Sequence, residues 1–349
     1  MISGRSRRPL RIGPSCYHVL HLVPPTIADQ LNYFYDEGLH DEDGLETYEI
    51  VPDSHAPFMF EKQTLWQTMK ERGIDVTMDV KPSTVAFLQQ QGKGLRVIAG
   101  WRNQMAFYVV GRSGLSTLKD LVGTRVGIID PDDILVTMLT YWLIQEGIDP
   151  KNDIEWVTGI DTRRGPFALR EGRADAAFVD SLDLPGLLDE GYVQIFDVGA
   201  HYPNGRPDRV IAATEKAIDE RPEDLKAFIK GMIRAYWFIR RQPENIELTA
   251  AIEARLRRRS PDPDERVRMA QFGSAVQAEM MPFPFDGLPI GLEQYLNEAV
   301  VIGAIDALIE PNKISQLDMA KEAYGELSTR SELQDDLERA RQVTAKYGF

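Results

Sequence analysis

The residues best suited to chemistry directly follow predicted strands near the N-terminus. Cys16 follows the first such strand, His18 lies two residues further on, and His55 lies in the loop after the second strand. Near a helix N-terminus, backbone N–H groups and the helix dipole can lower a thiol pKa from about 8.5 toward neutrality. A thiolate is a nucleophile, and an imidazole can activate it or protonate a carbanion. We therefore predict a catalytic centre of Cys16, His55 and His18; the structural alternatives are a buried thiol and loop histidines.

A second set of polar, cationic and aromatic side chains follows the predicted strand ends and could bind a ligand. Ligands of parallel sheets bind beyond the carboxyl ends of the strands. Lysine and arginine suit carboxylate or sulfonate oxygens, and aromatic rings either stack on a ligand or pack in the core. The residues are Ser15, Tyr17, Ser54, Lys81, Ser83, Trp101, Arg102, Asp130, Arg163, Arg164 and Asp180. They predict a small anionic ligand, and an aromatic one would suit the rings.

The sequence gives less support to a metal site or a nucleotide site. Cys16, His18 and His21 could reach one metal ion if their segment is helical, but no fourth ligand is evident. The acidic run at 130–133 is typical of a helix N-cap, and the glycines at 92–94 and 111–114 match neither a dinucleotide fingerprint nor a P-loop. We therefore expect no metal and no cofactor.

The composition excludes several partners. The net charge of −14 over 349 residues argues against nucleic acid, because phosphate binding needs a concentrated basic surface. A single cysteine allows no internal disulfide. No apolar stretch reaches the ~20 residues of a membrane span, and no signal-peptide core precedes the first strand. We expect a protein without membrane insertion, in the cytoplasm, or in the periplasm if a signal peptide has been removed.

Strand-like and helix-like segments alternate through the first two thirds of the chain, which predicts an α/β fold with a largely parallel sheet in each of two lobes. The predicted strands are 10–13, 47–52, 74–80 and 95–99 in the first lobe and 105–110, 125–129, 154–157 and 176–179 in the second. From about residue 204 the chain is predicted to be mostly helical. A long helix begins near Pro222 and has apolar residues at helical spacing.

Several short motifs occur in a recognisable order. In the first lobe they are LRIG at 10–13, FYDEGL at 34–39 and LRVIAG at 95–100. Further along they are LKDLVG at 118–123, LREGRADA at 169–176, ERPE at 220–223 and RQPE at 241–244. Together, over residues 10–244, they resemble the nitrate/sulfonate/taurine-type substrate-binding proteins. The resemblance implies a two-lobed, type II periplasmic-binding-protein-like fold with a ligand cleft between the lobes and a helical C-terminal region. Lobe I would comprise 1–104 and 205–349, and lobe II 105–204.

The resemblance leaves two functions open, because function belongs to the site and not to the fold. The same fold family includes thiamine-pyrimidine synthases, whose cysteine-rich iron motif has no counterpart here. It also includes 4,5-dihydroxyphthalate decarboxylase and 2'-hydroxybiphenyl-2-sulfinate desulfinase, and the latter is similar to this chain in having a cysteine after its first strand. One hypothesis is thus a cytoplasmic decarboxylase, desulfinase or related enzyme that cleaves a C–X bond, with Cys16 and a histidine in the cleft. The other is a solute-binding protein that delivers a small organic anion to an ABC permease.

Overall fold

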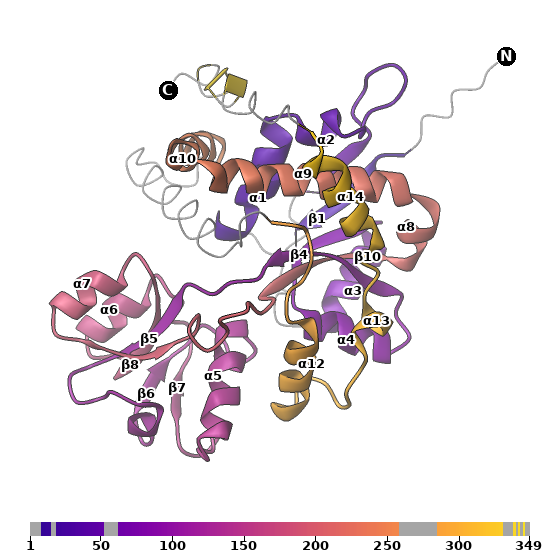
Figure 1. Cartoon of the computed structure of the whole chain (residues 1–349). Coiled ribbons are helices and arrows are strands. Elements are labelled where there is room, and N and C mark those ends of the chain that lie inside the picture. Colours follow the sequence, from indigo (N-terminus) through magenta and orange to yellow (C-terminus); the bar gives the residue numbers. More distant parts are fainter. Residues whose placement is uncertain are drawn as a thin grey trace.

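The strands of this protein form two separate sheets, each in its own lobe (Figure 1). The computed structural model describes residues 8–14, 19–51, 62–257 and 285–330, together with 338, 339, 341, 342 and 345. Within these residues each sheet has five strands, and in each sheet one strand runs against the other four. The predicted α/β class is confirmed, and the sheets that were predicted as largely parallel are mixed.

The first sheet has the strand order β2-β1-β3-β10-β4. Its strands are β1 (Leu10–Pro14), β2 (Tyr48–Ile50), β3 (Val76–Val80), β4 (Leu95–Arg102) and β10 (Arg209–Thr214). β10 is antiparallel to both neighbours, so the carboxyl ends of the other four strands share one edge. The sequence prediction of mostly helix after residue 204 was wrong for β10. A short apolar run has no periodicity that distinguishes a buried strand from a helix.

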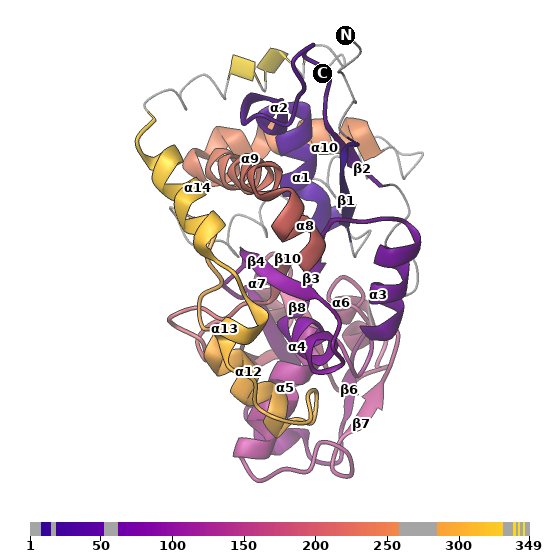
Figure 2. The ribbon, with the colours of Figure 1, turned by 90° about the vertical axis from the view of Figure 1, so that its right-hand side faces the viewer.

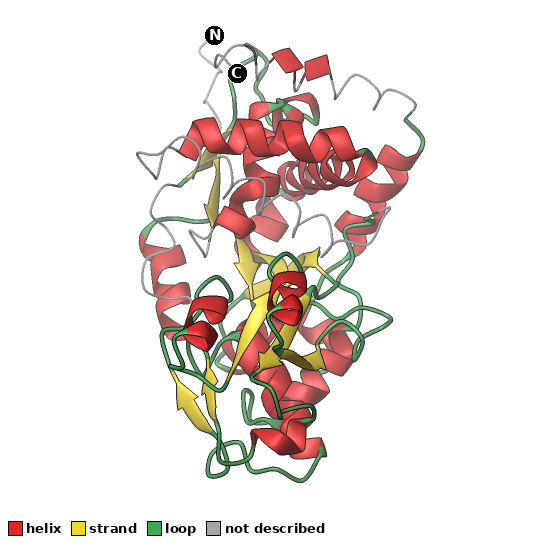
Figure 3. Ribbon diagram, turned by 90° about the vertical axis from the view of Figure 1, so that its left-hand side faces the viewer, coloured by secondary structure: helices red, strands yellow, loops and turns green. Residues whose placement is uncertain are grey.

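Helices cover both faces of the first sheet (Figure 3). One face is packed by α1 (Val19–Gln30), α2 (Tyr33–Asp36), α9 (Pro222–Arg241) and α14 (Asp318–Ser328). The other face is packed by α3 (Lys62–Glu71), α4 (Pro82–Gln90), α12 (Leu292–Val301) and α13 (Pro311–Ile314). The remaining helices of this lobe among the described residues are α8 (Glu215–Glu220) and α10 (Pro243–Arg257). The sheet is therefore buried on both sides, and a ligand can reach it only at an edge.

The long helix α9 illustrates how local sequence sets an element. Pro222 occupies its first turn, where the missing N–H is not needed, and acidic residues follow it. Arg240 and Arg241 close its last turn, where cations favour the helix dipole. Its apolar stripe packs on α1, α2 and α14, and the ring of Phe228 stacks on Phe34 with centroids 5.3 Å apart. The apolar residues that the sequence places at helical spacing lie in the core of the first lobe.

The second sheet has the strand order β7-β6-β8-β5-β9. Its elements are β5 (Phe107–Gly111), η1 (Leu118–Leu121), β6 (Arg125–Gly127), α5 (Ile134–Gln145), β7 (Glu155–Val157), α6 (Gly165–Arg170), β8 (Ala176–Asp180), α7 (Leu184–Asp189) and β9 (Val193–Asp197). Alternate residues of β8 face opposite sides. Ala176 and Phe178 belong to the apolar cluster that includes α5, whereas Ala177 and Val179 pack with Leu169 of α6 and Leu187 of α7.

In the part of the chain that the structure describes, the backbone crosses between the lobes twice, at residues 103–106 and 198–208. Each crossing leaves from the carboxyl end of a strand, β4 or β9, and enters the next sheet from the same side. That is why the strands that follow, β5 and β10, run against their neighbours. The carboxyl edges of both sheets consequently face one interlobe boundary. The predicted division of the chain, at 104/105 and 204/205, places its limits within these two segments.

A third connection comes from the C-terminal helices. Figure 2 shows α14, α13 and α12 in succession along one side of the protein. α12 packs against α4 in the first lobe and also against α5 in the second. None of the helices within the described residues is long and apolar enough to cross a bilayer.

Candidate functional site

The predicted catalytic residues cannot be placed in the site. Cys16 and His18, with Ser15 and Tyr17, fall in residues 15–18, and Ser54 and His55 fall in residues 52–61; both segments lie outside the described residues. The strands that precede them, β1 and β2, end at the boundary edge of the first sheet. The predicted pairing of Cys16 with a histidine stays a prediction.

Lys81 directly connects the two lobes. It follows β3 and precedes the first residue of α4, Pro82. Its ammonium donates a hydrogen bond to the main-chain oxygen of Asp132, in the turn that precedes α5. The Asp130 carboxylate shapes this turn by accepting the N–H of Asp132 at 2.9 Å. The predicted ligand-binding residues Lys81 and Asp130 thus lie on opposite sides of the boundary.

The acidic run in the same turn caps α5. The side chain of Asp133 accepts a hydrogen bond from the N–H of Leu135 at 2.9 Å, which satisfies one of the free donors at the helix start. The prediction that this run is a helix N-cap is confirmed. Burial raises the pKa of Asp133, and the nearby guanidinium of Arg209 opposes that effect.

A cluster of buried charged residues lies where the second crossing ends and β10 begins. Arg209 lies 2.9 Å from Asp208, 3.4 Å from Asp79 and 4.0 Å from Asp133. Burial acts to lower the pKa of Arg209, but these three carboxylates outweigh it and raise the pKa above its ordinary value. Asp79 has a φ of +67°, a conformation that costs energy outside glycine. Tertiary contacts therefore hold this residue in a strained backbone.

Arg102 belongs to the same cluster and is only 1% exposed. It forms an ion pair with Asp208 and lies 3.7 Å from Asp79. The sequence predicted that Arg102 would bind a ligand acid, but the structure gives its guanidinium carboxylate partners within the protein. Sequence reasoning missed Asp79 and Arg209, although a charged residue inside an otherwise apolar strand was a signal for a buried pair.

The other predicted ligand-binding residues are distributed unevenly. Trp101 is fully buried in the first lobe, edge-on to Tyr236 at 6.2 Å between centroids, so it takes the core role that the sequence allowed as its alternative. The Ser83 hydroxyl forms a 3.0 Å hydrogen bond with the hydroxyl of Tyr295. Arg163 pairs with Asp161 at 2.9 Å, and Arg164 is exposed in the same loop after β7.

Asp180 differs from these residues because it is completely buried at the carboxyl end of β8. Burial, followed by the charge of Asp183, raises its pKa to about 7. Its Oδ1 accepts hydrogen bonds from the N–H groups of Leu182 and Asp183. A carboxyl that changes charge near neutral pH can donate or accept a proton under physiological conditions.

Aromatic and charged residues support the second crossing. The guanidinium of Arg206 lies over the rings of Tyr202 and Tyr295, 5.2 Å and 4.2 Å from their centroids, and 2.7 Å from Glu298 of α12. The Tyr202 hydroxyl donates to Glu298 at 3.2 Å and accepts from Trp142 of α5 at 3.0 Å. This network joins helices of both lobes. The sequence analysis missed it because its members are far apart in the chain.

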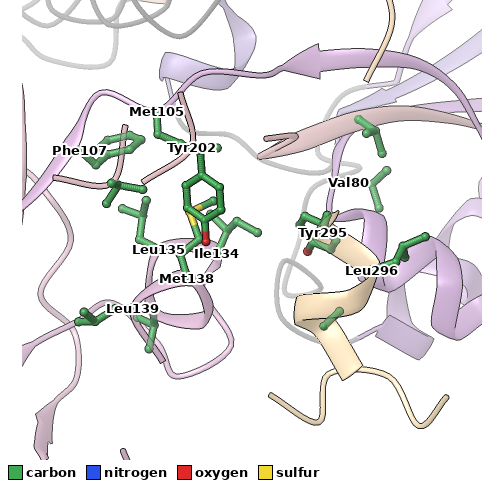
Figure 4. Packing of buried hydrophobic residues seen from close by; sticks show 14 of the residues in the cluster. Val80, Met105, Phe107, Ile134, Leu135, Met138, Leu139, Tyr202, Tyr295 and Leu296 are labelled. Carbon is green, nitrogen blue, oxygen red and sulfur yellow. The ribbon is translucent and has the colours of Figure 1, made fainter. Parts of the chain in front are cut away.

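Apolar side chains from both lobes line the boundary. In Figure 4, Met105, Phe107, Leu135 and Tyr202 lie on the side of the second lobe, and Tyr295 and its neighbours Val80 and Leu296 on the side of the first. The described part of the boundary therefore combines an apolar, aromatic surface with charges that are paired inside the protein.

The sequence analysis expected no metal, although Cys16, His18 and His21 could reach one ion if their segment is helical. Among the residues that the structure describes, no three His, Cys, Asp or Glu side chains converge on a point where an ion could bind. Cys16, His18 and the His21 side chain lie outside that set.

Comparisons with known proteins agree with this architecture. The family model described as NMT1/THI5 like matches residues 22–246. Among curated proteins, the chain is 24% identical over 228 residues to the nitrate import ATP-binding protein NrtC of Synechococcus elongatus. That match covers 61% of this chain and 33% of NrtC, so the chain spans a third of the length of this relative.

Solved structures share the fold. The periplasmic nitrate-binding protein NrtA of Synechocystis PCC 6803 is 13% identical with a TM-score of 0.63, over 97% of this chain and 99% of NrtA. The periplasmic aliphatic sulphonate binding protein SsuA of Escherichia coli is 14% identical with a TM-score of 0.62, over 89% and 92% of the two chains. A cysteine-to-serine variant of DszB in complex with biphenyl-2-sulfinic acid is 12% identical with a TM-score of 0.59, over 92% and 99%. At these identities the likeness shows the fold alone, and it confirms the two-lobed, type II periplasmic-binding-protein fold.

Proposed function

Because this chain belongs to the NMT1/THI5-like family, we propose that it binds a small organic anion between its lobes and delivers it to an ABC permease. The observation that carries the proposal is the Lys81 contact. A buried ammonium on one lobe reaches the main-chain oxygen of Asp132 on the other, at the boundary toward which both sheets turn their carboxyl edges. A cation at such a boundary favours an anion, and two crossings are the arrangement expected for hinge closure.

The surroundings of Lys81 support the ligand class. Phe107, Tyr202 and Tyr295 are buried aromatic side chains beside this boundary. An apolar, aromatic boundary suits the body of an organic ligand, while the ammonium suits its acid group. The proteins of similar fold include binders of nitrate and aliphatic sulphonate. Carboxylates, sulfonates, sulfinates and nitrate are therefore the anions to examine.

An enzyme that cleaves a C–X bond of the same anions is the second candidate. Asp180 favours it, because a buried carboxyl with a pKa of about 7 can exchange a proton at physiological pH. The likeness to DszB supports the fold on which such chemistry would run. The roles predicted for Cys16, His18 and His55, and the location in the cell, stay predictions.

Calorimetric titration with nitrate, ethanesulfonate, benzoate and biphenyl-2-sulfinate, with mass spectrometry of each compound afterwards, tests the proposal. We expect at least one compound to bind and to be recovered unchanged. Lys81→Met should weaken that binding at least about tenfold, or ~1.4 kcal/mol. Lys216→Met is the matched control, because Lys216 is exposed on α8 in the first lobe; it should bind like the parent.

Two results would contradict this proposal. Conversion of a compound by the parent, lost in Cys16→Ala, would establish the enzyme. Binding of none of the four by a protein with an intact circular dichroism spectrum would reject the small organic anion as ligand.

A further inference from the structure

One oxygen of Asp180 is buried without a partner. Oδ1 accepts hydrogen bonds from the N–H groups of Leu182 at 3.0 Å and Asp183 at 3.3 Å, which shapes the turn between β8 and α7. Oδ2 is equally buried, yet within the described part of the chain it has no hydrogen-bond partner. A buried polar atom without a hydrogen-bond partner destabilises the folded state. The turn accounts for the burial of Oδ1, which accepts its N–H groups. It does not account for the burial of Oδ2.

The position of Asp180 is at the ligand side of its sheet. It is the last residue of β8 and lies opposite Phe107, which directly follows the first crossing. By strand alternation its side chain shares the face of Ala176 and Phe178, the face packed by α5. Phe107 and α5 both contribute to the apolar boundary between the lobes. The unpartnered oxygen therefore lies where that boundary meets the end of the strand.

No cation among the described residues forms an ion pair with Asp180. The ionisable group whose charge acts on it is Asp183, and Arg170 of α6 acts in turn on Asp183. Burial and this like charge both disfavour the carboxylate, so the neutral acid prevails below about pH 7. In that form Oδ2 can carry a hydrogen and become a donor.

We propose that Asp180 contacts the bound ligand and that its protonated carboxyl donates a hydrogen bond from Oδ2 to an oxygen of the ligand's acid group. The inference rests on the proposed function and narrows its ligand to an oxyanion. The proton stays on Asp180 throughout, so no bond of the ligand is made or broken. Because only the protonated form binds, affinity falls as pH rises.

Calorimetric titration of the parent with ethanesulfonate, benzoate, nitrate and biphenyl-2-sulfinate, from about pH 6 to about pH 9, measures this dependence. These anions stay ionised over the whole range. One proton per binding event predicts roughly a hundredfold weaker binding at the upper end. Asp180→Asn keeps a donor and the Oδ1 acceptor without a titrating proton, so its affinity should hardly change with pH. Asp180→Ala should bind weakly at every pH.

Asp149→Asn is the matched control. Asp149 also caps a turn, accepting the N–H of Lys151 at 3.0 Å, but it lies beyond the far end of α5 and is exposed. The Asp149→Asn variant should show the same dependence of affinity on pH as the parent.

Four results would overturn the inference. Parent binding that is independent of pH would show that the proton of Asp180 does not control the affinity. A pH dependence that persists in Asp180→Asn would assign the effect to another group. Either result would leave the proposed function intact. Affinity that rises with pH would show that the protonated carboxyl of Asp180 does not favour the anion, which contradicts the inference. If no anion binds at any pH, the inference falls together with the proposed function.

Discussion

The guanidinium of Arg209, at the start of β10, lies 4.0 Å from the carboxylate of Asp133, the N-cap of α5. The first residue belongs to one sheet, and the second begins the helix that covers the other. The same guanidinium is 3.4 Å from Asp79 in β3. Arg209 thus interacts with a carboxylate of each lobe, beside the segment that joins them.

Asp133→Asn should let the lobes separate more readily. Asparagine keeps the helix cap but removes the charge that faces Arg209. The closed arrangement of the lobes should be destabilised by about 1–2 kcal/mol. This is less than the ~3–5 kcal/mol that a buried charge costs when it is left without any partner. Small-angle X-ray scattering should give a larger radius of gyration for the variant. Because the pKa of Asp133 is raised, acid should neutralise it in the folded parent and bring the parent toward the variant.

Asp318→Asn is the control for that comparison, because Asp318 is exposed on α14 and pairs only with Lys321 among the described residues. A radius that is equal in the parent and both variants would contradict a role of Asp133 in closure.

Arg206→Met should destabilise the protein by about 3–5 kcal/mol, because Glu298 would remain buried without its cation. Adding Glu298→Gln removes the unpaired charge and should recover much of the loss. Urea denaturation of the single and double variants measures the free energy of unfolding. Equal stability of the single and double variants would contradict the unpaired charge of Glu298 as the cause of the loss.

Gly231→Ala should destabilise the packing of α9 against α2. A Cβ at this position would lie 2.4 Å from the Phe34 ring, and overpacking of this kind costs about 1–3 kcal/mol. Gly325→Ala in α14 is the matched helical control, because nothing lies within 4 Å of its added Cβ. It should stabilise by about 0.5–1 kcal/mol through helix propensity. Thermal unfolding measures the stability of both variants. The two changes in stability, relative to the parent, should have opposite signs.

Asp180→Asn should stabilise the unliganded protein at neutral pH. The pKa of Asp180 rises from 3.8 to about 7 on folding, so the folded state binds the extra proton between these values. Parent stability should therefore fall as pH rises from about 4 to about 7 and then level off. The advantage of the variant should grow from near zero to at most about 4 kcal/mol over this range. Denaturation at several pH values measures it, and a constant difference would refute the shifted pKa.

Most element positions could be predicted because their signals are local. Pro82 at the start of α4 and the capping Asp133 before α5 mark helix starts in the sequence itself. β10 escaped prediction because its register is set by β3 and β4 on either side of it, and neither is near it in the chain.

The residues of the candidate site also differ in how much their position in the sequence reveals. Position after a strand end selected Lys81, Asp130 and Asp180, and the structure places them at the interlobe edges of the two sheets; their role in ligand binding stays a prediction. It was not enough for Arg102 and Trp101, since a strand end does not reveal whether the side chain faces a ligand, a buried carboxylate or the core.

The sequence by itself determined the α/β class, the two lobes and the strand ends that carry polar residues, because periodicity and capping act over a few neighbouring residues. Only the tertiary structure decided which charges meet. Asp79, Asp133 and Arg209 come from β3, the turn before α5 and the start of β10. Their attraction acts through space, and it exists only once the two crossings bring both carboxyl edges to one boundary.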